Sequence, residues 1–275
     1  MYINRNIIWF ICLSGLVLGQ SCDKEVPELY SIQDEILLAD ELRLKISEDS
    51  TFQILPQTDY ALSYTYAQQI FESIVGLNNP DSVSPVANVD VYQWEILLLN
   101  EAEINAFVTP GGKVYINTGL VKILANADEF AAMLAHLINH SDQRHVTKRL
   151  LNFFSSKELL NASKGVDDIT LDRIANNLFG KNVAFTFSLG DEQEADDFTV
   201  ISLSKTEYAC NGAIGFYQKL NKQEEQGNQP DFFVAHSNYD SRLENINLKA
   251  FELSCSIDLK EGGGFTYQNF KNSLP

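Results

Sequence analysis

Hydrophobic residues recur at helical spacing through most of this chain, and short apolar runs of strand character occur only in its middle. An apolar stripe on one face predicts an amphipathic helix. We therefore expect helices over 32–46, 59–75, 118–124, 189–204, 213–226 and 241–253, with further helical parts in 157–180. Three apolar runs predict strands over 92–99, 106–109 and 113–117. The fold class is then α+β, mostly helical, with a small, partly antiparallel sheet.

The longest helical pattern starts near Asn126 or Asp128, either of which suits an N-cap, and extends to about Phe153. It contains His136 and His140. Four residues along a helix turn the chain by about 400°, so both imidazoles project from one face. Two imidazoles on one face of a helix can bind the same metal ion. We therefore expect this to be the central helix of the domain and the one that holds its metal site.

The beginning of the chain reads as an export signal followed by an anchor. Residues 1–21 contain Arg5 and an apolar run over 7–18, which is typical of a signal peptide. Cys22 follows a small residue, as in a bacterial lipoprotein cleavage site, although Gly19 stands where leucine is usual. This predicts a protein of the bacterial cell envelope that is lipid-anchored at Cys22, on the periplasmic side of the outer membrane or at the cell surface. Ordinary secretion and an uncleaved anchor stay open as alternatives.

The rest of the chain divides into a short tether, one domain and an end. A polar tether is expected over 22–31, one large domain over 32–255, and a loose, glycine-containing C-terminal tail over 256–275. The formal net charge of −17 disfavours nucleic acid as a partner. Cys210 and Cys255 would remain in an oxidising compartment, where they either pair or stay free.

Carboxylates at helical spacing accompany the two histidines. A zinc site of this kind needs a third protein ligand from elsewhere in the chain, and Glu192 is the candidate. Asp196 lies four residues on and shares its helical face, so it can hold the second nitrogen of a metal-bound imidazole.

Around these residues the chain resembles the zinc metallopeptidases of family M48, which include HtpX, BepA and the CAAX prenyl protease. The resemblance rests on Asn105-Ala106-Phe107, Pro110-Gly111-Gly112, Val114-Tyr115, Thr118-Gly119-Leu120, the His136/His140 pair, Arg144-His145, Glu192 with Ala195-Asp196, Gly212 and 216–220. It implies that the 32–255 domain is metallopeptidase-like, with a zincin-like fold and about one Zn²⁺ per chain. In BepA-like members a later histidine takes the fourth metal position and an arginine six residues on faces the site, and His236 and Arg242 match these two.

The resemblance also implies a setting and a type of partner. Envelope protein quality control is the expected process, and proteins or extended peptides are the expected partners. Such a peptide would add to the edge of the 113–117 strand. Arg242 would then be either a stabiliser of the transition state or an ordinary surface cation, and His145 is expected to point outward without chemistry.

The chain departs from the family at Leu137. In the H-E-x-x-H motif this position holds the glutamate that activates the metal-bound water, and leucine has no group to do so. Asp142 and Glu194 are expected on other helical faces, while Asp191 and Glu129 stay open as substitutes.

Three hypotheses follow. The first is a catalytically impaired metallopeptidase homologue that still binds metal and peptides, with Leu137 in core packing. The second is an active zinc endopeptidase with a relocated base. The third is a structural or interaction lipoprotein in which the histidines bind nothing.

Overall fold

The computed structural model describes residues 30–50, 52–76, 84–179, 186–227, 232, 235–236, 239–258 and 266–275. The signal, Cys22 and most of the predicted tether lie outside the described residues. Within the described part, no helix is both long and apolar enough to cross a bilayer.

The sheet has three strands in the order β1-β3-β2. β1 (Glu95–Leu99) pairs with β3 (Lys113–Asn117) in parallel, and β2 (Ala106–Val108) pairs with β3 in antiparallel orientation. The predicted mixed sheet is therefore confirmed, as is the α+β class. Between β2 and β3, Gly111 and Gly112 have φ values of 77° and 93°, which residues with a Cβ atom rarely adopt.

One expectation about this sheet is wrong. The 113–117 strand was predicted to offer a free edge to a peptide, but β3 is the central strand and both of its edges are paired. It is apolar because it is buried between two neighbours, and continuous burial is typical of an interior strand. Among the described strands, β2 lies at the edge beside the metal-site helix.

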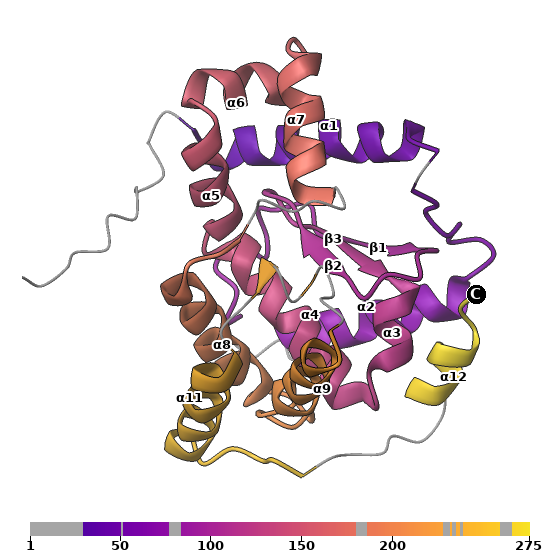
Figure 1. Cartoon of the computed structure of the whole chain (residues 1–275), viewed down its shortest axis with the longest axis vertical. Coiled ribbons are helices and arrows are strands. Elements are labelled where there is room, and N and C mark those ends of the chain that lie inside the picture. The colour runs from indigo at the N-terminus through magenta and orange to yellow at the C-terminus, as the bar shows by residue number, and fades with distance from the viewer. Residues whose placement is uncertain are drawn as a thin grey trace, which may run out of the picture.

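Helices lie around the sheet in three groups (Figure 1). At one end lie α1 (Ile32–Glu48), α6 (Ser156–Ser163) and α7 (Asp168–Phe179). At the other lie α8 (Leu189–Leu203), α9 (Ala213–Glu225) and α11 (Tyr239–Glu252). Near the sheet lie α2 (Ala61–Val75), α3 (Thr118–Ile123) and α4 (Ala127–Asp142).

The register of the strands explains how the two faces of the sheet are covered. Val114 pairs with Ile96 and faces α2, whereas the next residue, Tyr115, stacks on Phe107 of β2 and contacts Phe179 of α7. Because alternate side chains on a strand point to opposite faces, both faces are apolar and both are covered.

The long central helix predicted to reach Phe153 is two helices. α4 ends at Asp142, Arg144 adopts a left-handed conformation with φ 59°, and α5 (His145–Phe153) begins directly after it. Tertiary contacts offset the cost of this backbone conformation. The Asp142 carboxylate accepts hydrogen bonds from the backbone of 87–88, and the Arg144 guanidinium donates to Glu35 of α1.

The expected loose tail is also corrected for its described part. Residues 266–275 form α12 (Tyr267–Asn272), whose aromatic side chains are buried against α2 and α4. The Tyr267 hydroxyl donates to the Val121 carbonyl, and Lys271 donates to that of Leu124. Two buried rings and these hydrogen bonds hold this segment on the core. The sequence did not predict this packing, because the residues around the two aromatic positions are mostly polar.

Replacing Phe270 with alanine is expected to destabilise the whole domain. Phe270 is fully buried against Tyr66 and Phe130, and removing a buried phenylalanine costs about 3 kcal/mol or more. Urea unfolding measures the change. Phe251→Ala, at a side chain that is 83% exposed, is the matched control and should change the unfolding free energy by less than about 0.5 kcal/mol. Equal effects would mean that α12 lies outside the cooperative core.

Candidate metal centre

Four side chains converge on one point between α4 and α8. α4 contributes His136 and His140, α8 contributes Glu192, and His236 comes from the stretch before α11. α4 and α8 pack directly against each other, which brings the two motifs of the sequence together. All four residues are at most 2% exposed.

The distances between their donor atoms match those of a shared cation. His136 Nε2 lies 3.0 Å from His140 Nε2 and 3.1 Å from His236 Nδ1. Glu192 Oε1 lies 2.9 Å from His236 Nδ1 and 3.4 Å from His140 Nε2. Ligands bonded to one tetrahedral zinc lie about 3.3 Å apart, given bonds of about 2.0 Å.

The donor set therefore fits zinc. Three imidazoles and one carboxylate are common zinc ligands, and these four offer atoms that all lie within 4.8 Å of one another. Ring nitrogens with facing lone pairs repel each other unless a proton or a metal ion lies between them. When bound, zinc acts as a Lewis acid and lowers the pKa of a coordinated water, provided that a coordination position is open to water.

The charge states of three of the four residues suit metal binding, which needs neutral histidines and an ionised carboxylate. Burial and the neighbouring His136 hold the pKa of His140 well below its usual value, and burial also lowers the pKa of His236. Burial alone would raise the pKa of Glu192, but Arg242 and His236 outweigh it and hold that pKa well below its usual range. His136 differs, because hydrogen bonds to Asp196 and Glu192 overcome burial and raise its pKa.

Asp196 lies where its predicted role requires. Its Oδ1 is 3.1 Å from His136 Nδ1, so it can accept the proton of that nitrogen while Nε2 faces the other ligands. The Tyr217 hydroxyl donates to the same oxygen at 2.9 Å. Tyr217 was not singled out from the sequence, although it belongs to the 216–220 segment that resembles the family.

Arg242 is not a surface cation, so that alternative is wrong. It is 0% exposed, and its Nε and Nη2 donate to the two oxygens of Asp196 at 2.6 and 2.8 Å. Its Nη1 pairs with Glu192 and donates to the His236 carbonyl. Two buried carboxylates without a cation would cost several kcal/mol, and Arg242 reduces this cost by pairing with both and offsetting one of the two negative charges.

His145 is also placed differently from the expectation of an outward residue. It is fully buried, with Nδ1 3.2 Å from His140 Nδ1 and Nε2 3.1 Å from Glu194 Oε2. The break between α4 and α5 turns it inward, which a continuous helix would not do.

Two aromatic rings cover the histidines. Phe187 stacks on His140 with ring centroids 3.8 Å apart, and Phe232 stacks on His236 at 4.4 Å. Neither ring was expected from the sequence, because Phe187 and Phe232 lie outside the periodic apolar patterns that predict the helices and strands. They shield the ligands from water and fix the planes of the imidazoles.

Leu137 points into the hydrophobic core and is 1% exposed. The carboxylates considered as substitutes for the missing base are held elsewhere. Asp142 accepts the backbone bonds described above, Glu129 is paired with Lys219, and Asp191 caps its own helix through Ser188. Glu194 contacts His145 rather than a candidate ligand.

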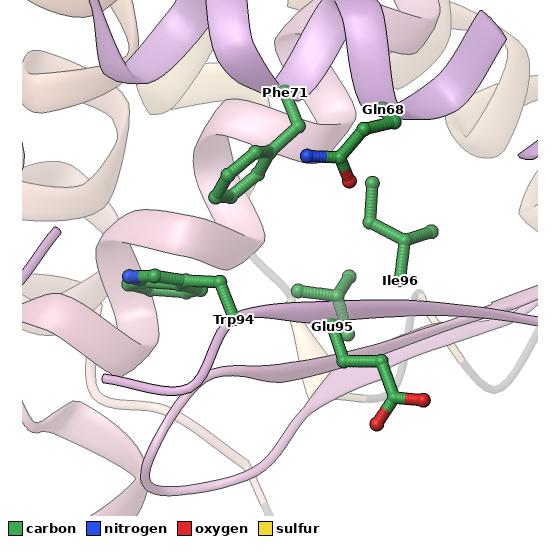
Figure 2. A pocket seen from close by; sticks show the side chains of 6 residues that line it. Gln68, Phe71, Trp94, Glu95 and Ile96 are labelled. Carbon is green, nitrogen blue, oxygen red and sulfur yellow. The ribbon is translucent and has the colours of Figure 1, made fainter. Parts of the chain in front are cut away.

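A separate hollow lies between α2 and β1 (Figure 2). It measures about 150 Å³ including open solvent, and it is lined by Gln68, Phe71, Trp94, Glu95, Ile96 and Val114. The Glu95 carboxylate on its rim is engaged by Arg43. It shares no lining residue with the metal site and is too small for a peptide.

Comparison with known proteins decides the family. The family model described as peptidase family M48 matches residues 80–250, which is more than half of the chain. The chain belongs to peptidase family M48. The matched range includes all four candidate ligands, together with Asp196 and Arg242.

Several M48 relatives with established names are similar to this chain. The mitochondrial metalloendopeptidase OMA1 of Saccharomyces cerevisiae is 29% identical over 216 residues, covering 74% of this chain and 61% of its own length. The beta-barrel assembly-enhancing protease of Yersinia pestis is 26% identical, covering 58% of this chain and 35% of its own length. The metalloprotease LoiP of Escherichia coli is 26% identical, covering 66% and 69%. The chain thus spans only part of the first two relatives.

Proposed function

We propose that this chain is a catalytically impaired M48 metallopeptidase homologue that binds zinc and holds extended protein segments without cleaving them. Leu137 carries the proposal. It stands in the motif where the general base belongs, and a positioned base contributes about 10²–10⁴-fold to such reactions.

A fourth protein donor adds to this proposal without carrying it, because the resemblance gives BepA-like members the same histidine. Catalytic zinc sites use three protein ligands and keep one position for water or substrate, whereas structural sites are closed. Here His236 supplies a fourth donor at hydrogen-bond distance from His136 and Glu192. With four protein donors around one point, His236 competes with water for the position that hydrolysis needs.

The partner is an unfolded or extended polypeptide that pairs with the β2 edge. β2 lies at the edge of the described sheet and beside α4, so a peptide there would pass close to the ligands. Backbone hydrogen bonds along such an edge bind many sequences.

The setting is the bacterial envelope, with Cys22 as the lipid anchor, and the process is protein quality control. The names of two relatives, a beta-barrel assembly-enhancing protease and a mitochondrial metalloendopeptidase, support an activity on proteins.

The test measures zinc, cleavage and binding in one preparation. We expect the purified, zinc-loaded chain to bind fluorescent, unfolded β-casein and to leave it intact, with no cleavage above that of His136→Ala. Zinc-dependent cleavage that is absent in His136→Ala would establish an active endopeptidase instead. A chain that holds no zinc and binds no casein would be a structural lipoprotein, and the proposal would be wrong.

A further inference from the structure

His145 connects a candidate ligand to the protein surface. Its ring lies between His140 and Glu194, with one nitrogen toward each. The Glu194 side chain is 46% exposed, while His145 and His140 are fully buried. The three residues therefore form a chain of hydrogen bonds that leads from the metal site to solvent.

The geometry determines the direction of each hydrogen bond. His140 Nε2 faces the other donors, at 3.0 Å from His136 Nε2 and 3.4 Å from Glu192 Oε1, so its proton belongs on Nδ1. His140 Nδ1–H then donates to His145 Nδ1. That nitrogen must be unprotonated, which leaves the His145 proton on Nε2, where it donates to Glu194 Oε2.

We propose that His145 is a positioning residue of the metal site, which fixes the tautomer and ring orientation of His140 through this bond, with Glu194 as its anchor. This inference rests on the metal-binding part of the proposed function. Ligating histidines usually give their second N–H to a carboxylate, a carbonyl or water. His136 follows that rule with Asp196, whereas His140 uses a neutral imidazole.

The break between α4 and α5 is what makes this contact feasible. In a continuous helix, five residues correspond to about 500°, so positions 140 and 145 would lie about 140° apart around the axis. The left-handed Arg144 redirects the chain, and its guanidinium is held by Glu35 and the Tyr30 carbonyl. The backbone is thus fixed on one side of His145, and Glu194 holds the ring on the other.

The first experiment compares two substitutions of His145 in the purified chain. His145→Asn keeps an acceptor near the position of Nδ1, and His145→Leu removes it at similar volume. We expect His145→Leu to weaken zinc binding about 10–100-fold in competition with a fluorescent chelator, and His145→Asn to stay within about threefold of the natural chain. Thermal unfolding with excess chelator shows whether the metal-free variants are folded.

The Glu194 anchor has a matched control on the same helix. Glu194→Gln should weaken zinc binding a few-fold, because an exposed anchor contributes less than the buried ring. Asp197→Asn removes a similarly exposed carboxylate, 49% exposed and paired with Lys249, and should leave zinc affinity unchanged. Equal effects of these two substitutions on zinc affinity would contradict the role of Glu194 as the anchor of His145.

A spectroscopic test decides the matter even if the variants fail to fold. The chain has four histidines, so ¹⁵N spectra of the zinc-loaded protein can assign each tautomer. We expect His140 protonated on Nδ1 and His145 on Nε2. A His145 protonated on Nδ1, or a folded His145→Leu with unchanged zinc affinity, would overturn the inference. If the natural chain itself binds no zinc, the proposed function fails first, which separates the two failures.

Discussion

Replacing His136 with alanine is expected to lower the zinc content from about one ion per chain to less than about one tenth. His136 Nε2 lies within 3.5 Å of donor atoms from His140, His236 and Glu192, so its loss removes a donor that contacts all three other candidate ligands. Replacing a residue that hydrogen-bonds to a metal ligand already lowers the metal affinity about 10–100-fold, and replacing a ligand itself lowers it further. Elemental analysis of the purified protein measures the content, and chelator competition measures the affinity.

The control for this prediction is a second buried change in the same helix. Ser141→Ala removes a hydroxyl that donates to the Thr109 carbonyl at 3.0 Å, but Ser141 contributes no donor to the metal site. It should lower stability by about 1 kcal/mol and keep the zinc. If His136→Ala and Ser141→Ala retain equal zinc, the site is somewhere else in the molecule. If the natural chain contains none, the histidines serve only as buried polar residues.

The spacing of the ligands could be predicted because helical geometry is local. His136 and His140 are four apart, as are Glu192 and Asp196, and a helix brings each such pair onto one face whatever surrounds it. The structure puts these residues together because α4 and α8 pack against each other. That contact is tertiary, and its prediction depended on a family resemblance rather than on spacing.

The surroundings of the ligands could not be predicted in the same way. Arg144 carries no glycine or proline signal, yet it ends a helix in the left-handed region because Glu35, 109 residues earlier, binds its guanidinium. The burial of Arg242 likewise depends on carboxylates of another helix. Charged residues are usually read as surface residues, and only their distant partners reverse that expectation.

The order of the strands in the sheet could not be predicted from the sequence either. The alternation and length of the 113–117 segment predicted a strand, and it is one, but strand order is a property of pairing. Complete burial of all its residues is the physical sign that it is internal. The outer strands of the described sheet are β1 and β2, and the peptide-binding edge proposed above is that of β2, where Phe107 is only partly buried.

Leu137→Glu together with His236→Ala is expected to create zinc-dependent peptidase activity at least about 10²-fold above the background of the natural chain. The first change supplies a carboxylate at the motif position that activates water, and the second opens a coordination position to that water. Neither single change should exceed a few-fold gain, because residues that act as a unit are strongly non-additive. Cleavage of fluorescent casein with added zinc measures the rate.

The matched control is Leu137→Gln with His236→Ala, which has the same shape and the same open position but no carboxylate. Because Leu137 is buried in the core, both pairs will lose stability, and circular dichroism with zinc analysis must show that each is folded and loaded. Equal activity of the glutamine and glutamate pairs would mean that the base is not what the chain lacks. A folded, zinc-loaded glutamate pair without activity would mean that the base and the open position are not the only parts lost. In that case the β2 edge would be the next place to look, because a repaired metal site cleaves nothing that it does not hold.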